Sequence, residues 1–364
     1  MPGFILIYIM VQTFSLQRAV QLLLLVFLVV AGLWIAKPFL VPVCFGALLA
    51  MLFLPLSRWF EQKKIPKGIA ILFCILLLLS IITIIILGIS WQVTDLTSEV
   101  TDIENRVMKM VDEFKQFISN RFGIPVKQQE KLLLQQAQNP AASGIVLNIG
   151  SSLASLLVDF ILCLVYIFLF MYYRIRIKKF MFQLIPTRQK ENAQHVIHDI
   201  QQVTQQYVTG IGWMMICLWI MYGIGFSIVG VKYAVFFAIL CGLLEIIPFI
   251  GNLTGNLLTI LMVIIQGGST GMVLAVLLTY AIVQFIQTYL LEPLVVGAGV
   301  NINPLFTIIV LVLGDLIWGI PGMILAIPLL GIVKIVCDHI EPLKPYGFLI
   351  GHDRKKKRVL IKNK

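Results

Sequence analysis

The chain has 364 residues, of which 59% are hydrophobic and only 12% are charged, about half the charged share of a typical soluble domain. This composition excludes a water-soluble globular protein, because uninterrupted apolar runs of about twenty residues or more are long enough to cross a hydrocarbon core of about 30 Å. The net charge of +11 comes from basic residues gathered at the ends of these runs, which indicates membrane orientation and not binding to nucleic acid.

Five apolar spans are predicted in the first 230 residues, at 20–36, 39–59, 69–91, 153–173 and 211–229. We therefore expect an all-α polytopic membrane protein with about eight hydrophobic segments. It divides into three N-terminal transmembrane helices (1–91), an extracytoplasmic helical insert (92–150), a fourth transmembrane helix with a cytoplasmic amphipathic helix (151–209), a C-terminal membrane core (210–340) and a basic tail (341–364).

The insert carries an apolar seam with alternating steps of four and three residues, which predicts an amphipathic helix of about three heptads. One interpretation is a helix that packs on its own subunit, and the other is a coiled-coil-like contact in a homo-oligomer. The seam consists of Leu96, Val100, Ile103, Val107, Met110, Phe114 and Phe117. A weaker stripe between Thr187 and Tyr207 predicts a helix at the membrane interface or beneath the bundle.

Two longer apolar segments, 234–266 and 305–337, flank an ordinary span at 272–291. A continuous helix of either length would extend about 50 Å, far more than the membrane thickness. Each contains a breaker near its midpoint, at 248–252 and at 319–322. We expect about fourteen helical residues on either side of each break, as in two re-entrant hairpins. Kinked full spans are the alternative.

The basic residues predict the orientation, because twenty of the twenty-eight Lys and Arg fall on one set of connections. We expect both termini in the cytoplasm and the chain in the cell inner membrane. The single cysteines and the sparse histidines fit no disulfide, metal or cofactor site; His195 and His198 share a helical face but have only Glu191 and Asp199 nearby.

No Lys or Arg lies between Lys232 and Lys334, yet three carboxylates do. An ionised carboxylate at mid-membrane costs roughly 2.5–3.5 kcal/mol, so these side chains should face a protein interior or an aqueous cavity. Uncharged polar residues crowd the same region. We predict that the pathway for substrate or ions is lined by Glu245, Asn252, Asn256, Gln284, Gln287, Glu292, Asn301 and Asp315, and that the hairpin tips are shaped by Pro248, Gly251, Gly319, Pro321 and Gly322. Capping of broken helix ends is the simpler alternative for any single acid.

Enzyme motifs are absent from the sequence: it has no GxSxG elbow, HExxH, P-loop or strand-linked GxGxxG. Interrupted membrane helices with buried acids instead indicate a transporter. Without a nucleotide-binding domain, such transport is gradient-driven or facilitated. We do not expect an enzyme.

Three stretches of the C-terminal half, at 243–251, 292–297 and 318–329, resemble signatures of the autoinducer-2 exporter family, also called PerM-type permeases. The resemblance extends over nearly the whole chain and includes the prolines at 38, 42 and 55. It implies an exporter of a small polar solute such as the autoinducer-2 signal, or a sodium or lithium/proton antiporter, with H+ or Na+ as a partner ion. A non-transporting membrane scaffold is the alternative from another class. Asn252 and Thr288 depart from the residues expected at these positions, proline and asparagine.

Overall fold

The computed structural model describes residues 16–97, 116, 141–186, 190–247, 250–296 and 302–351, and this part of the chain is helical without a β-strand. Seven of the described helices are long and apolar enough to cross a bilayer. Large apolar side chains on their outer faces are exposed, Leu23 and Phe27 by 71% each, as a lipid-facing surface requires. The predicted class is confirmed: the protein is an all-α polytopic membrane protein.

The N-terminal half forms four long helices whose apolar stretches are the first four predicted spans. They are α2 (Leu16–Ile35), α3 (Lys37–Gln62), α4 (Lys67–Thr97) and α7 (Ala141–Leu184). Buried side chains from α3, α4 and α7, including Phe53, Ile71 and Met171, form a shared core. The seam predicted in the insert lies outside the described residues except for Leu96, in the last turn of α4.

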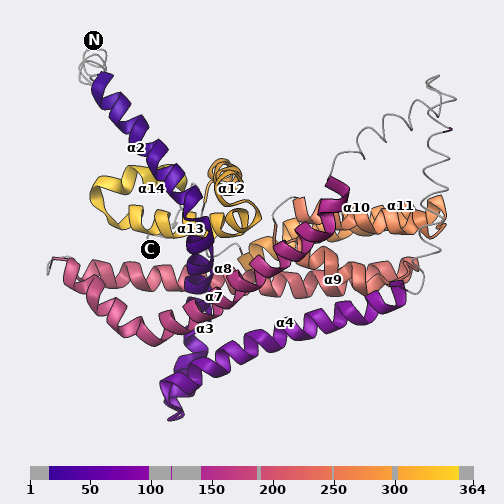
Figure 1. The fold of residues 1–364 in the computed structure, drawn as a ribbon, viewed down its shortest axis with the longest axis horizontal. Helices are drawn as coiled ribbons and strands as arrows, with labels where there is room; N and C mark the ends of the chain where they lie inside the picture. Colours follow the sequence, from indigo (N-terminus) through magenta and orange to yellow (C-terminus); the bar gives the residue numbers. More distant parts are fainter. Residues whose placement is uncertain are drawn as a thin grey trace, which may run out of the picture.

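Helix α8 (Lys190–Val229) runs through the middle of the molecule and is contacted by α3, α9, α11 and α13 (Figure 1). Its 40 residues extend about 60 Å, twice the hydrocarbon thickness. The predicted amphipathic segment and the predicted fifth span are therefore not separate helices. They join in one continuous helix because no proline lies between Tyr207 and Ile211. The single glycine there, Gly210, is tolerated within a helix.

The first long segment is broken as the sequence predicts, into α9 (Ala234–Leu244) and α10 (Ile250–Ile265). We call these two helices the first hairpin. They lie antiparallel, because Gly251 at the start of α10 is close to Leu244 at the end of α9, and Gly255 one turn later is close to the earlier residue Cys241. A Cβ on Gly251 would overlap the backbone of Leu244, so the turn into α10 needs glycine at this position.

The second long segment forms α12 (Pro304–Trp318) and α13 (Ile320–His339), which we call the second hairpin. Gly319 separates the arms with φ 69° and ψ −148°, a conformation that glycine adopts readily. The two arms differ in length, whereas the sequence predicts about fourteen helical residues in each. Helix α12 has 15 residues, and α13 has 20, which is enough to span a bilayer. A 3₁₀ turn (Glu341–Leu343) and α14 (Lys344–Ile350) close the described chain.

The span predicted at 272–291 differs from an ordinary helix. Helix α11 (Thr270–Ile286) continues into a π-helix, η2 (Gln287–Val296). Such wide turns are rare and occur frequently at functional sites. Both α11 and η2 contact α8, and α11 contacts α10, so this segment lies beside the first hairpin. Figure 1 shows α9, α10 and α11 grouped together, with α12, α13 and α14 gathered in another part of the molecule.

Candidate functional site

Polar side chains from four elements meet beside the break of the first hairpin. Hydrogen bonds connect them, and we call this set the Asn252 network. Its members are Tyr222 on α8, Asn252 and Asn256 on α10, Gln284 on α11 and Thr288 on η2. Asn252, Asn256 and Tyr222 expose 5%, 2% and 1% of their surface, so the centre of the network is enclosed by protein.

Asn252 joins the helices at the centre of the network. Its Oδ1 accepts a hydrogen bond of 2.9 Å from the Tyr222 hydroxyl, and its Nδ2 donates to Oε1 of Gln284. Gln284 in turn donates from Nε2 to the Thr288 hydroxyl at 3.2 Å. One amide thus ties α10 to both α8 and α11, which fixes the rotation of α10 about its axis.

Asn256 lies one turn further along α10 and turns its amide nitrogen toward the same centre. Nδ2 donates to Oδ1 of Asn252 at 2.9 Å and to the Tyr222 hydroxyl at 3.2 Å. The carbonyl oxygen Oδ1 of Asn256 is buried and has no hydrogen-bond partner among the described residues.

A carboxylate lies at the start of the break in the first hairpin. Glu245 follows α9 directly, and its Oε1 accepts a hydrogen bond of 2.5 Å from Nε2 of Gln287, the first residue of the π-helix. Gln287 is 4% exposed, and its own Oε1 is a second buried oxygen without a partner in the described structure. Glu292 lies on the same π-helix as Gln287, and its side chain is exposed.

The two unpartnered oxygens are informative because buried polar groups are almost always hydrogen-bonded. An unsatisfied buried acceptor costs about 1–3 kcal/mol. Asn256 Oδ1 and Gln287 Oε1 are therefore acceptors whose hydrogen-bonding capacity is unused in this structure.

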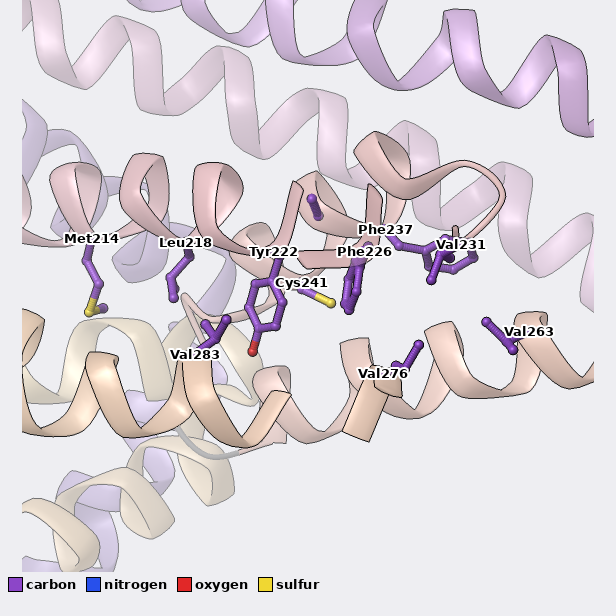
Figure 2. Close-up of a cluster of buried hydrophobic side chains, with 11 residues drawn as sticks. Met214, Leu218, Tyr222, Phe226, Val231, Phe237, Cys241, Val263, Val276 and Val283 are labelled. Atoms are coloured by element: carbon purple, nitrogen blue, oxygen red, sulfur yellow. The ribbon is translucent and has the colours of Figure 1, made fainter. Parts of the chain in front are cut away.

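An apolar shell supports the network from α8, α9, α10 and α11. Figure 2 shows Tyr222 projecting from α8 toward the helix that carries Val283, with Phe226 and Cys241 beside it. Close backbone approach holds α9 against α10: a Cβ on Gly255 would stand 3.0 Å from the Cα of Cys241. The polar groups thus occupy a fixed place in an otherwise apolar bundle.

The structure brings together five of the eight residues predicted to line the pathway: Glu245, Asn252, Asn256, Gln284 and Gln287. Glu292 lies beside this group on η2. Asp315 does not join it, since it is exposed on α12 in the second hairpin. Asn301 and Pro248 lie outside the described residues.

The remaining predicted tip residues have distinct positions. Gly251 is in the first turn of α10. Gly319 separates α12 from α13, and Pro321 and Gly322 lie in the first turn of α13. A Cβ on Gly314 would lie 2.6 Å from the Gly322 carbonyl oxygen, so these two glycines let the arms of the second hairpin touch through their backbones.

Sequence reasoning missed Tyr222. This tyrosine lies in an apolar span that also contains several other aromatic residues, so its type alone did not distinguish it. A buried tyrosine hydroxyl usually finds a hydrogen-bond partner, and its spacing from Leu218 and Phe226 on one face of α8 is the signal that was available. The sequence of η2 contains no pattern from which its π-helical conformation could have been predicted.

Comparisons with known proteins agree with a transport role. Residues 22–341 match the family described as "AI-2E family transporter". "Putative transport protein YrrI" of Bacillus subtilis is 24% identical over 89% of this chain and 98% of its own length, and "Putative transport protein YueF" of the same organism is 26% identical over 86% and 89%.

"AI-2 transport protein TqsA" of Escherichia coli is 22% identical over 88% of this chain and 92% of its own length. The family match covers most of the chain, and these relatives are transport proteins, not enzymes. The chain therefore belongs to the AI-2E family of membrane transporters.

Proposed function

We propose that this transporter exports a small, polar, uncharged solute such as the autoinducer-2 signal across the cell inner membrane, and that the solute binds at the Asn252 network. Transport is gradient-driven or facilitated, and both termini lie in the cytoplasm. The distribution of basic residues supports this orientation. The name of the Escherichia coli relative supports the solute class.

The observation that carries the proposal is the pair of buried, unpartnered amide oxygens, Asn256 Oδ1 and Gln287 Oε1. Solute hydroxyls would donate to them and recover a free-energy cost of about 1–3 kcal/mol for each oxygen. Amides and hydroxyls also surround them, a set that suits a polyhydroxylated solute.

The charge of the region favours a neutral or cationic cargo. The sequence has no Lys or Arg between Lys232 and Lys334, and the Glu245 carboxylate is bound to Gln287, one of the two residues with a free oxygen. An anionic solute would meet a carboxylate and no compensating cation in this segment. In this proposal the broken segments are re-entrant, and movement of the first hairpin against α8 alternately opens the network to the two sides.

Reconstituted vesicles test the proposal. Purified full-length protein and the variants Asn256→Leu and Gln287→Met are inserted in liposomes, and efflux of loaded autoinducer-2 is followed over time. Each variant removes one free oxygen, so we expect at least a tenfold lower rate, which corresponds to about 1.4 kcal/mol. Thr307→Val removes a hydroxyl that bonds only within the second hairpin, to the Asn303 carbonyl, and should transport normally. Equal rates in all four proteins would refute the assignment.

A second function, sodium or lithium/proton antiport, is favoured by one specific feature. Glu245 and the two free amide oxygens form a set of oxygen ligands of the kind that binds hard cations. Addition of Na+ or Li+ to vesicles with an imposed pH gradient would dissipate the gradient in the wild type and fail to do so in Glu245→Gln. Autoinducer-2 efflux without any cation effect favours the exporter instead.

A further inference from the structure

A separate cavity of about 390 Å³ lies among α3, α7, α8 and α13, away from the Asn252 network. Its size falls within the range of small-molecule sites, about 300–1,000 Å³. Most of its lining is apolar, with Leu54, Phe170, Ile200 and Ile332 as representatives of the four helices. Nothing in the transport mechanism proposed above uses this cavity.

The cavity is amphipathic along its length. Arg58, Arg174 and Lys178 line it together with the apolar side chains. On α3 its lining begins at Ala47 and ends at Arg58, eleven residues apart, or about 16 Å of helix. The cationic end lies where α3 reaches the side of the membrane that holds most of the basic residues, and the apolar part extends from there into the hydrocarbon.

Arg174 has hydrogen-bonding capacity at this end that its single acidic partner leaves unused. Its Nη2 pairs with Oε2 of Glu61 at 2.5 Å, and Glu61 also accepts a hydrogen bond from the Ser57 hydroxyl at 3.0 Å. The other terminal nitrogen, Nη1, is fully buried and has no hydrogen-bond partner among the described residues. Three cations thus face the cavity with one acid beside them, and a buried guanidinium N–H is left unsatisfied.

From this geometry we propose that the cavity binds one anionic phospholipid of the adjoining leaflet, with its phosphate on Arg174 and an acyl chain along the apolar wall. Because Nη2 of Arg174 is paired with Glu61, the phosphate accepts from the unpartnered Nη1, and Lys178 and Arg58 supply further positive charge. Basic pockets between transmembrane helices are typical sites for anionic headgroups. A water-soluble anion would gain nothing from the long apolar wall. The lipid links α3 and α7 to α8, the helix that also carries Tyr222.

Native mass spectrometry of the full-length protein in detergent tests the site. Phosphatidylglycerol and phosphatidylcholine with identical acyl chains are titrated separately. We expect the wild type to retain phosphatidylglycerol at concentrations at least tenfold lower than phosphatidylcholine. Arg174→Gln should abolish this preference. Arg176→Gln, which removes an exposed cation of α7 that does not line the cavity, should keep it. Equal retention of both lipids, or equal loss in both variants, would overturn the proposal.

Two further sets of measurements complete the test. Should Arg174→Gln not yield folded protein, the double variant Arg58→Gln/Lys178→Gln leaves the ion pair with Glu61 intact and should lose the preference equally. Ile200→Trp fills the apolar wall without a change of charge and should also weaken phosphatidylglycerol binding. Displacement of the lipid by millimolar inorganic phosphate would instead identify a site for a soluble anion and would contradict a lipid site.

Discussion

The two helical hairpins have similar sequence patterns but different interiors. The first hairpin places amides, hydroxyls and a carboxylate against α8, α11 and η2. The second encloses apolar side chains, with Leu311, Met323 and Ala326 in one buried cluster, and touches the first through Ile247. A broken membrane helix is therefore not in itself a binding site, because among the described residues only the first break collects polar groups with free hydrogen-bonding capacity.

The glycines show the same contrast. Gly242 and Gly314 precede their breaks at nearly the same distance, yet Gly242 makes room for the Trp219 side chain of α8, whereas Gly314 faces Gly322 within its own hairpin. Glycines at similar distances from the two breaks thus serve two different contacts. In the second hairpin this glycine joins the two arms to each other, whereas in the first it joins the hairpin to α8.

The largest effect should come from the backbone contact in the second hairpin. Gly314→Val places a Cβ 2.6 Å from the Gly322 carbonyl oxygen, and the two helix backbones cannot separate without loss of the packing around them. We expect a loss of about 1–3 kcal/mol or more in unfolding free energy, and little monodisperse protein in detergent. Gly212→Ala is the control, since nothing lies within 4 Å of a Cβ there. Normal thermal stability of Gly314→Val would show that the close contact between Gly314 and Gly322 is not needed to hold the two arms together.

The next effect separates the acids of the two hairpins. Glu245→Gln removes the carboxylate that accepts from Gln287, whereas Asp315→Asn makes the same chemical change on an exposed side chain of α12. We expect solute efflux from vesicles to fall at least tenfold in the first variant and less than twofold in the second. Membrane protein levels should match in both. Equal loss of transport would place Asp315 in the pathway and remove the contrast between the hairpins.

A smaller effect is expected from two aromatic residues that each donate one hydrogen bond. Tyr222→Phe removes the hydroxyl that bonds Asn252, at a cost of about 1 kcal/mol in stability. Trp318→Phe removes the indole N–H that donates to the Leu33 carbonyl at 2.9 Å, together with packing volume, so its stability cost should be larger. The effect on the transport rate should have the opposite order: we expect a three- to tenfold lower rate in Tyr222→Phe and an unchanged rate in Trp318→Phe. Melting curves and efflux rates measured on the same samples separate the two quantities.

The spans and breaks were predictable because they are encoded locally. Length and hydropathy define the crossings, and a break is favoured where Gly319, Pro321 and Gly322 follow one another closely. The partners of each polar residue were harder to predict, because they depend on the rotation of each helix about its axis. Contacts such as that between Gly255 and Cys241 set this rotation, and they are not visible in hydropathy. For this reason the sequence analysis placed Asp315 and Glu245 in one predicted pathway, although the structure places Asp315 on an exposed face of α12.

The smallest expected effect lies at the exposed end of the Asn252 network. The Thr288 hydroxyl accepts from Nε2 of Gln284, but the side chain is exposed, so in Thr288→Val the freed N–H finds another partner at little cost. We expect a change in efflux of twofold or less, compared with none for Thr307→Val in the second hairpin, measured as initial rates over a range of solute concentrations. A rise in KM with unchanged kcat would mean that Thr288 contacts the solute at the entrance. A tenfold loss would contradict a graded network and place the solute at its exposed end, beside Glu292, instead of at Asn256 and Gln287.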